Sequence, residues 1–368
     1  MRTAVFHNFL DNIGGAEIVA LTLAKELGAD LYTTNIDPEK IEKMGFENVL
    51  PRIYSIGKIP INAPLRHQLA FWKFRKLNLK NKYDFYIIAG DWAMSGAVNN
   101  KPNLWYVHSP LNELWAFKNY IKNNVLSWWQ KPLFDIWVLI NRYLTKKYSE
   151  HVGTWICNSK NVQERIEKCY KKDATVINPP IDTKKCYCGE SQNYWLSVNR
   201  LSKAKRIDIQ LKAFSLLPSE KLIIVGCYEK GAKQFENEKY EIEKTIPRNV
   251  LIKSWVSQSN LTDLYANCKG FITTSTNEDF GMNVVEAMAS GKPVIAPNEG
   301  GYKETIINGK TGILIDDINE NKIAEAIKKL GEKINKNPLR FKDSCQKQAK
   351  KFDIAIFINK IKKIVTEK

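Results

Sequence analysis

The sequence predicts an α/β protein made of two doubly wound parallel sheets. With 368 residues the chain is too long for one ordinary hydrophobic core and suits two domains. In both halves, short apolar segments alternate with segments of helical periodicity, which is typical of βαβ units. Between the halves, Asn178-Pro179-Pro180-Ile181-Asp182 interrupts regular structure and is the expected linker.

The first half begins with a strand predicted over residues 3–9. Gly14-Gly15 opens a helix that runs to Leu27, and Gly28 ends it. Further strands are expected over residues 85–89, 104–107 and 155–157, the last followed by the helix cap Asn158-Ser159 and a helix over 160–170.

The second half repeats the alternation of strands and helices. Its strands are expected over residues 195–199, 222–225, 250–252, 270–274, 294–296 and 312–315, with helices between them. Residues 341–368 are expected to be helical and basic. The pattern in each half is that of a Rossmann-like sheet.

Composition places the chain among globular proteins. It is 44% hydrophobic, has a net charge of +17 and contains seven scattered cysteines. No apolar run is long enough to cross a bilayer, and the first residues lack the features of a signal peptide. We therefore expect a cytoplasmic protein with reduced thiols and anionic partners.

Two segments favour a membrane surface among those partners. Residues 48–83 contain eight Lys or Arg and no acidic residue, and residues 105–148 are rich in Trp and Tyr. Such segments can lie on anionic lipid, here the inner face of the membrane, through Lys73, Arg75 and Lys76. The alternative is ordinary helices with a solvated basic face. Motifs for reading RNA or DNA are absent, so no nucleic-acid partner is expected.

Residues 273–297 give the strongest indication of chemistry. Phe280-Gly281 lies between an apolar strand and an apolar helix, so the amides at the helix start should face the loop and suit a phosphate. Glu278 and Glu286 stand eight residues apart. Glu286 lies among apolar helical residues, where a carboxylate either accepts hydrogen bonds, for example from sugar hydroxyls, or points to solvent.

This segment resembles the donor-site signature of the retaining glycosyltransferases of family 4, which have the GT-B fold. The family pattern is Glu, seven residues and Glu, with Phe-Gly after the first Glu and Ala-Met-Ala-x-Gly-x-Pro-Val after the second. The likeness continues through residues 300–304 and 308–312, and a weaker likeness covers the chain from residue 1 to about residue 330. The full string is far more specific than the glutamate spacing alone.

The resemblance implies a GT-B enzyme, with two Rossmann-like domains that face a cleft. The expected domains are 1–178 for the acceptor, 179–345 for the nucleotide-sugar donor, and 346–368 as a helix that crosses back to the first. The implied activity is retaining transfer of a hexose from a nucleoside-diphosphate sugar to a glycan or lipid-linked acceptor.

The resemblance also assigns roles to residues of the signature. By this likeness Glu278 orients the transferred sugar and Glu286 holds ribose hydroxyls. The amide groups of Phe280, Gly281 and Met282 would meet the phosphates.

Arg200 and Lys205 follow the first predicted strand of the second half, where ligands bind in parallel sheets. Two cations suit a diphosphate. The family has Gly-Arg-Leu followed by Lys at this spacing, and these residues clamp the donor diphosphate. Asn199 replaces the family's Gly, and the additional cations Lys203 and Arg206 leave open which side chain binds.

Two features of the first half are similar to family motifs. Gly14-Gly15-Ala16-Glu17 is similar to a Gly-Gly-Ala-Glu motif that faces the donor phosphate and the acceptor, although a tight turn would also explain the glycines. His108 resembles a histidine at the same strand end in relatives, which contacts the donor sugar or acceptor. A lone histidine is more often structural.

The absence of an Asp-x-Asp motif after a strand predicts an enzyme without metal or cofactor, in which Arg200, Lys205 and the Gly281 helix stabilise the departing diphosphate. Residues 106–111 look like the mannosyltransferase subgroup of polysaccharide biosynthesis. Asn112 stands where that subgroup tends to have Arg, so both GDP-mannose and UDP-sugars remain open as donors. The alternatives are another GT-B sugar-nucleotide enzyme, such as an epimerase, and a nonenzymatic binder of anions or membranes.

Overall fold

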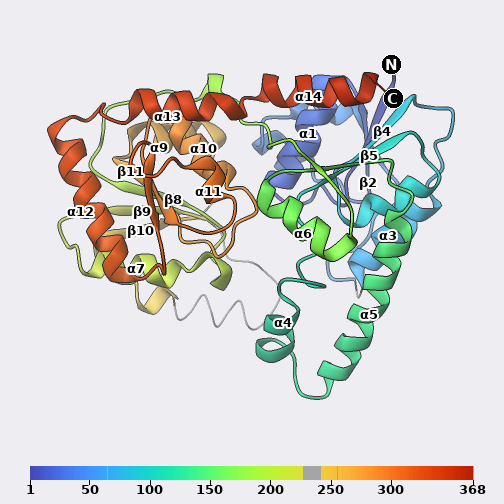
Figure 1. The fold of residues 1–368 in the computed structure, drawn as a ribbon, viewed down its shortest axis with the longest axis horizontal. Helices are drawn as coiled ribbons and strands as arrows, with labels where there is room; N and C mark the ends of the chain where they lie inside the picture. The colour runs from blue at the N-terminus through green and yellow to red at the C-terminus, as the bar shows by residue number, and fades with distance from the viewer. Residues whose placement is uncertain (64, 227–241, 255, 368) are drawn as a thin grey trace. The chain divides into compact units, whose positions relative to one another are not determined.

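The computed structural model describes residues 1–63, 65–226, 242–254 and 256–367 (Figure 1). The chain divides into two compact units. The first comprises Met1–Pro180 and Phe357–Lys368, and the second comprises Ile181–Ile356. Each unit contains a parallel sheet and a hydrophobic core of its own.

A parallel sheet forms the centre of the first unit. In the part of this unit that the structure describes, the sheet has seven strands in the order β3-β2-β1-β4-β5-β6-β7. The central strands are buried, as expected for a parallel sheet covered by helices. The strands are β1 (Thr3–Phe6), β2 (Asp30–Thr33), β3 (Ile53–Ser55), β4 (Phe85–Ile88), β5 (Asn103–Val107), β6 (Thr154–Cys157) and β7 (Thr175–Val176).

The helices of the first unit begin and end at residues that the sequence marks. α1 (Gly15–Leu27) ends where Gly28 adopts a left-handed conformation, with φ 59°. α6 (Lys160–Tyr170) begins where the Ser159 hydroxyl accepts a hydrogen bond from the Val162 amide at 3.1 Å. The other helical segments are α2 (Pro38–Lys43), η1 (Glu47–Arg52), α3 (Arg66–Lys76), η2 (Trp92–Val98), α4 (Lys118–Asn124), α5 (Gln130–Ser149) and the part of α14 (Ile354–Thr366) from Phe357 onward.

The second unit repeats this architecture. Among its described residues the sheet has six strands in the order β10-β9-β8-β11-β12-β13. These are β8 (Trp195–Val198), β9 (Leu222–Val225), β10 (Val250–Lys253), β11 (Gly270–Ile272), β12 (Val294–Pro297) and β13 (Gly312–Ile315). The helical segments are η3 (Thr183–Lys185), η4 (Lys203–Lys205), α7 (Ile207–Ser215), α9 (Gln258–Asn267), α10 (Met282–Ala289), α11 (Tyr302–Thr305), α12 (Glu320–Lys336), α13 (Lys342–Ala349) and η5 (Lys350–Phe352).

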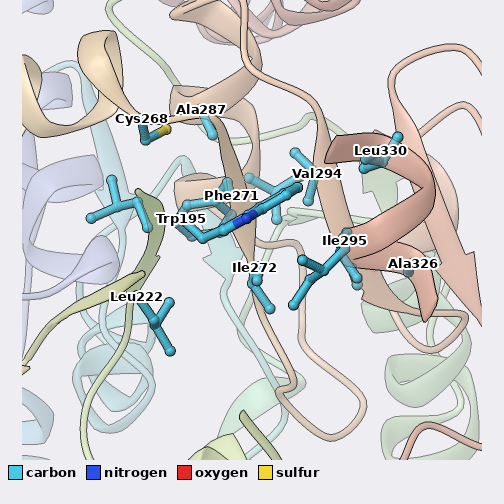
Figure 2. Close-up of a cluster of buried hydrophobic side chains, with 14 of the residues drawn as sticks. Trp195, Leu222, Cys268, Phe271, Ile272, Ala287, Val294, Ile295, Ala326 and Leu330 are labelled. Atoms are coloured by element: carbon cyan, nitrogen blue, oxygen red, sulfur yellow. The ribbon is translucent and has the colours of Figure 1, made fainter. Parts of the chain in front are cut away.

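The core of the second unit is built around Trp195 on β8 and Phe271 on β11 (Figure 2). Both side chains are fully buried. The indole Nε1 of Trp195 donates to Glu220 Oε2 at 2.9 Å, which satisfies its one polar atom. A Cβ on Gly270 would lie 2.6 Å from the Trp195 ring, so this glycine makes room for the indole.

In both sheets the chain order reverses between two central strands. These neighbours are β1 and β4 in the first sheet, and β8 and β11 in the second. The crevice outside the carboxyl ends of such a pair is the usual ligand site of a doubly wound sheet. The predicted α/β class with two parallel sheets is confirmed, and the segments after β8 and β11 contain most of the predicted site residues.

Candidate functional site at the carboxyl ends of β8 and β11

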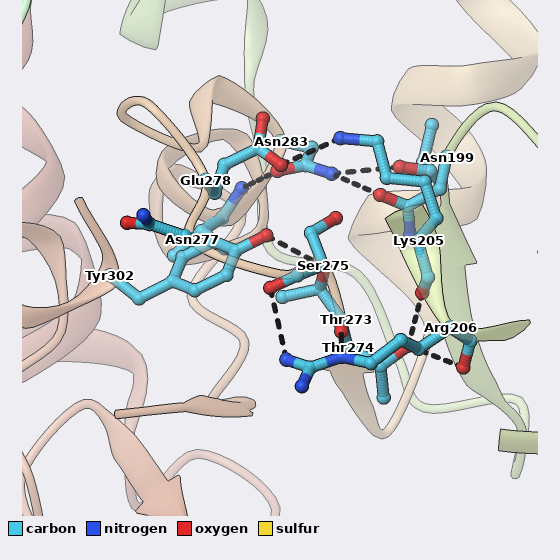
Figure 3. A network of polar contacts seen from close by, with 12 residues as sticks. Asn199, Lys205, Arg206, Thr273, Thr274, Ser275, Asn277, Glu278, Asn283 and Tyr302 are labelled. Carbon is cyan, nitrogen blue, oxygen red and sulfur yellow. Dashed lines mark hydrogen bonds and ion pairs between the residues drawn. The ribbon is translucent and has the colours of Figure 1, made fainter. Parts of the chain in front are cut away.

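Lys205 and Glu278 form an ion pair beyond the carboxyl ends of β8 and β11 (Figure 3). Lys205 ends η4, which follows β8, and Glu278 lies in the loop after β11. The Lys205 ammonium donates to Glu278 Oε2 at 2.6 Å. The two side chains are 18% and 24% exposed, so the pair remains accessible to a ligand.

Glu278 is held in its charged form. Burial raises the pKa of this carboxyl. The Lys205 ammonium, a hydrogen bond from Ser275 and the positive charge of Arg200 together lower it by more, so the net shift of the pKa is downward. The influence of Arg200 on this carboxyl means that both predicted cations act on the same place. The site therefore combines two positive charges with one negative charge, which suits a ligand with both anionic and hydroxyl groups.

Arg206, one of the two additional cations, has a structural role. Its guanidinium donates from Nε to the Thr274 carbonyl at 2.6 Å and from Nη2 to the Ser275 carbonyl at 3.4 Å. It also donates to Glu299 Oε1 at 3.0 Å, and Glu299 Oε2 accepts from the Asn277 amide at 3.0 Å. Arg206 thus joins the segments after β8, β11 and β12, and its charge is used within the protein.

Gly281 precedes α10 in a conformation that favours glycine. Its φ is 87°, and a Cβ here would lie 2.6 Å from the ring of Tyr302. Tyr302 is fully buried, with its hydroxyl 2.9 Å from Thr273 Oγ1. Gly281 supplies no side chain to cap α10, and Phe280, Gly281 and Met282 lie on the turn where amides of a helix start are available to an anion.

The loop that carries Glu278 packs closely against Gly300-Gly301. The Gly301 amide donates to the Glu278 carbonyl at 2.8 Å. A Cβ on Gly300 would lie 2.3 Å from that carbonyl oxygen, and a Cβ on Gly301 would lie 2.5 Å from Phe280 Cα. The Phe280 ring is buried against Phe352, with ring centroids 5.3 Å apart. Both contacts fix the backbone beside the ion pair.

Asn283 is a site residue that no sequence motif marked. From the first turn of α10 its Nδ2 donates to the Val198 carbonyl at 2.7 Å and to Asn199 Oδ1 at 3.4 Å. Asn199 in turn donates to Ser197 Oγ at 3.0 Å. Asn199, where the family has Gly, therefore helps to join the carboxyl end of β8 to α10. The sequence offered one signal for this contact, which is an amide side chain just after an apolar strand, Asn199, and another at the start of an apolar helix, Asn283.

Glu286 lies one helical turn further along α10 and is partly buried. Burial raises the pKa of its carboxyl, and a hydrogen bond from Tyr265 offsets only part of that rise. Burial, with the charge of Glu286 as a second cause, raises the pKa of the nearby Cys186 thiol to about 12. A carboxylate with a raised pKa gains stability from a ligand that donates hydrogen bonds to it.

Gly14 and Gly15 lie in the first unit, where α1 follows β1. Gly14 has an extended backbone with φ −167°, so the conformation does not require glycine. A Cβ there would meet only the movable carboxylate of Glu17, at 2.6 Å, and Gly15 is exposed. The tight-turn explanation therefore does not fit, and the glycines leave the start of α1 without side chains.

His108, after β5, lies near His7, after β1. Burial, together with the charge of His7, lowers the pKa of His108 to about 3, and a hydrogen bond to the Ala89 carbonyl opposes this shift. Burial likewise lowers the pKa of His7 to about 4, and its Nδ1 lies 3.2 Å from the Ala89 carbonyl oxygen. Both imidazoles are neutral at neutral pH. His108 Nε2 is buried with no hydrogen-bond partner among the described residues. His7 lies near His108 because β1 and β5 both pair with β4. This proximity arises from the tertiary fold, so the local sequence contained no signal for His7.

Acid should destabilise the protein through its histidines. Burial is the main cause that lowers the pKa of all four, which are His7, His67, His108 and His151. Between pH 6.5, the ordinary pKa of histidine, and about pH 4, the unfolded chain binds more protons than the folded one. The contribution of the histidines to the free energy of unfolding should therefore be complete above pH 6.5 and decrease as the pH drops toward 4. Urea unfolding at pH 7 and pH 5 measures this, and an unchanged pH dependence in the His7→Gln variant would contradict the assignment to His7.

Further features concern metals, thiols and membrane spans. No group of three or more His, Cys, Asp or Glu in the described ranges is placed to hold a metal ion. The six cysteines of those ranges are free thiols. None of the described helices has both the length and the apolar character needed to cross a bilayer.

Two family models match consecutive parts of the chain. The model described as Glycosyltransferase Family 4 matches residues 13–185. The model described as Glycosyl transferases group 1 matches residues 184–352. The chain belongs to the family 4 glycosyltransferases. In this glycosyltransferase the Lys205–Glu278 pair and α10 lie in the group 1 part, and Gly14, Gly15 and His108 lie in the family 4 part.

Curated relatives of this glycosyltransferase transfer different sugars. It is 26% identical to the alpha-1,3/1,6-mannosyltransferase ALG2 of Dictyostelium discoideum, over 85% of this chain and 86% of the relative. It is also 26% identical to the poly(glycerol-phosphate) alpha-glucosyltransferase of Bacillus subtilis, over 69% of this chain and 39% of the relative. The predicted likeness to mannosyltransferases is confirmed.

Solved structures with the same fold cover the whole glycosyltransferase chain. HepE of Anabaena in complex with UDP-glucose superposes with a TM-score of 0.78 at 19% identity, covering 100% of both chains. The sucrose-phosphate synthase of Thermosynechococcus elongatus gives a TM-score of 0.77 at 16% identity, covering 100% of this chain and 99% of the other. At these identities the likeness concerns the fold, and it confirms the predicted GT-B fold.

Proposed function

We propose that this glycosyltransferase moves a hexose from a nucleoside-diphosphate sugar to a glycan or lipid-linked acceptor, with retention of configuration and without a metal ion. The observation that carries the proposal is the Lys205–Glu278 pair at the reversal point of the second sheet. Beside it lie the charge of Arg200 and the helix start at Gly281. Cations and amides suit the diphosphate, and the carboxylate suits sugar hydroxyls.

The proposed roles follow from where charge develops in the reaction. As the bond between the anomeric carbon and the diphosphate breaks, negative charge grows on the departing phosphate oxygen. Arg200, Lys205 and the amides at the start of α10 would stabilise this charge, which is the task of a metal ion in other transferases. Glu278, kept charged by Lys205, would accept hydrogen bonds from the sugar hydroxyls and orient the ring.

The residues of the first unit complete the proposal. His108 has a neutral imidazole and a buried Nε2 without a partner in the described residues, which suits a hydrogen bond to the sugar or acceptor. Gly14 and Gly15 leave the start of α1 open to a phosphate or an acceptor.

The donor is proposed to be GDP-mannose or a UDP-sugar. A mannosyltransferase relative that is named for GDP-Man favours the first, and the complex of HepE with UDP-glucose illustrates the second on the same fold. Incubation with a panel of radiolabelled sugar nucleotides, with and without a chelator, tests the proposal. We expect transfer from one of these donors, retained anomeric configuration and an unchanged rate in chelator. An inverted product would contradict retention, and turnover that needs added magnesium or manganese would contradict metal independence.

Glu286→Gln should weaken the binding of the nucleoside diphosphate about tenfold or more, because hydrogen bonds to a charged group contribute about 1.5–3 kcal/mol. Ligand-free Glu286 has a raised pKa, so it becomes protonated at a higher pH than an ordinary glutamate. If the ligand binds the carboxylate, affinity of the wild type should fall as the pH drops through that pKa. Calorimetry across this range measures the effect. The Gln variant corrects for titration of the phosphate, and equal pH slopes for both proteins would contradict the role of Glu286.

A lipid-linked acceptor would bring the enzyme to a membrane, so we also propose peripheral association with an anionic leaflet. The net charge of +17 supports this. The predicted contact segment forms α3, whose Phe71 and Phe74 are buried in the core. Arg75 places its guanidinium over the Tyr148 ring at 5.5 Å. α3 therefore has the packing of an ordinary helix with one solvated face.

A further inference from the structure

α5 exposes five of its large apolar side chains on one side. On its other side, Phe134, Trp137, Leu144 and Tyr148 are partly buried against the core of the first unit. Its buried residues are Val138, Asn141, Thr145 and Ser149. Its large exposed residues, with 50–72% of each residue's surface exposed, are Leu133, Ile136, Leu139, Ile140 and Tyr143. Because these positions recur three or four residues apart, they form one face of the helix. We call this face the apolar face of α5.

The contacts on the opposite side fix which face of α5 is exposed. The Arg142 guanidinium donates from Nε to the Leu114 carbonyl at 2.9 Å and lies over the Trp115 ring at 4.2 Å. The buried Asn141 donates from Nδ2 to the Trp137 carbonyl at 2.7 Å, and Thr145 donates to the Asn141 carbonyl at 2.8 Å. The polar groups on the buried side are thus satisfied, so this orientation carries little penalty.

The apolar surface continues into the segment before α5. Trp128 is 83% exposed and Trp129 is 55% exposed, and Val125 at the end of α4 is also exposed. In Figure 1, α4 and the first turns of α5 lie apart from the strands of the first unit. So many exposed aromatic and aliphatic side chains within one short segment are rare on a monomer and mark an interaction site.

α4 and α5 form one packed hairpin. Asp135 on α5 forms ion pairs with Lys118, at 3.1 Å, and with Lys122, both on α4. Within α5, the rings of Phe134 and Trp137 stack with centroids 5.6 Å apart. The ion pairs of Asp135 therefore hold α4 against α5.

The charge around this surface indicates what covers it. Residues 115–149 contain six Lys or Arg and one acidic residue, Asp135, whose charge is already paired. Exposed Trp and Tyr with flanking Lys are typical of segments at the interface of an anionic bilayer. A second copy of the chain, also at +17, would bring two basic surfaces together.

We propose that the α4–α5 hairpin, over residues 117–143, docks this enzyme on an anionic lipid leaflet. Trp128 and Trp129 enter the boundary between head groups and acyl chains, and the apolar face of α5 lies in the plane of the interface. This inference rests on the membrane association proposed above and names the surface that carries it. It is independent of the transfer chemistry, so its test uses binding and no donor.

Flotation with vesicles of equal parts phosphatidylcholine and phosphatidylglycerol tests the proposal. We expect the wild type to float with the vesicles at low salt. The Trp128→Ala/Trp129→Ala and Ile136→Ser/Leu139→Ser variants should each need about tenfold more lipid for half binding. Because these side chains are exposed, the variants should unfold in urea at the wild-type midpoint. Leu216→Ser/Leu339→Ser, at 52% and 58% exposed in the second unit, is the matched control and should bind like the wild type.

Several results would overturn the proposal. The wild type could fail to float, or the hairpin variants could bind as well as the wild type. Equal binding to pure phosphatidylcholine would exclude an anionic leaflet as the preferred partner. Self-association in light scattering that the hairpin variants abolish would instead assign the surface to a second copy. Loss of transferase activity without loss of flotation would leave this inference intact and would contradict only the proposed function.

Discussion

Lys205→Ala is expected to lower kcat about 100-fold or more, the usual effect of removing one group that stabilises developing negative charge. The substitution also removes the ammonium that lies 2.6 Å from Glu278 Oε2. Burial would then raise the pKa of Glu278. As the pH is lowered, the variant should therefore lose activity at a higher pH than the wild type does. The free energy of unfolding should fall less than for a fully buried pair, because the two side chains are 18% and 24% exposed. Steady-state kinetics across pH, with urea unfolding of the same protein, measure both effects.

Lys203 provides the matched control for this experiment. It lies two residues before Lys205 and is exposed. We expect Lys203→Ala to retain the wild-type kcat and pH profile. A loss of turnover in the Lys203 variant equal to that of Lys205→Ala would contradict the assignment, since it would trace the effect to overall charge.

Gly281→Ala should destabilise the protein by about 2–4 kcal/mol, combining backbone strain with an overpacked contact. The strain arises because alanine rarely adopts a φ of 87°. The contact arises because the new Cβ would lie 2.6 Å from the buried ring of Tyr302. Since either the start of α10 or the ring must move, nucleoside diphosphate should also bind more weakly. Urea unfolding and calorimetry measure the two effects.

Gly309 separates strain from overlap. Its φ is 79°, and a Cβ there would have no atom within 4 Å. Gly309→Ala should therefore show the strain alone, about 1–2 kcal/mol, and leave nucleotide affinity unchanged. If the two variants lose equal stability, the contact with Tyr302 contributes nothing and the explanation given for Gly281 is wrong.

The strands that sequence predicted well are those with strongly apolar residues of their own. Residues 222–225 and 312–315 were predicted as strands, and β9 and β13 have these bounds. β2 and β3 were missed because β2 begins with Asp30 and β3 is a three-residue strand with two exposed residues. Both are strands because they extend the sheet from β1, which is an effect of tertiary structure.

The candidate site was predicted in part for a similar reason. Local sequence indicated Lys205, Glu278 and Gly281, but it could not separate the roles of Lys205 and its neighbour Arg206. That distinction arises from a backbone turn at Arg206, with φ 47°, and from carbonyls contributed by another loop. Sequence also showed the aromatic residues before and within α5, whereas the face that stays exposed depends on how the helix packs.

The contacts made by Arg206, Glu299 and Gly300-Gly301 bear on the kinetics of donor binding. They hold the loops after β8, β11 and β12 together in the ligand-free protein. The entropy of ordering these loops is therefore lost during folding, and little further ordering opposes the arrival of the nucleotide. Association should then proceed at the rate of ordinary diffusional encounter, and the preference for one donor over another should appear as a longer residence time of that donor.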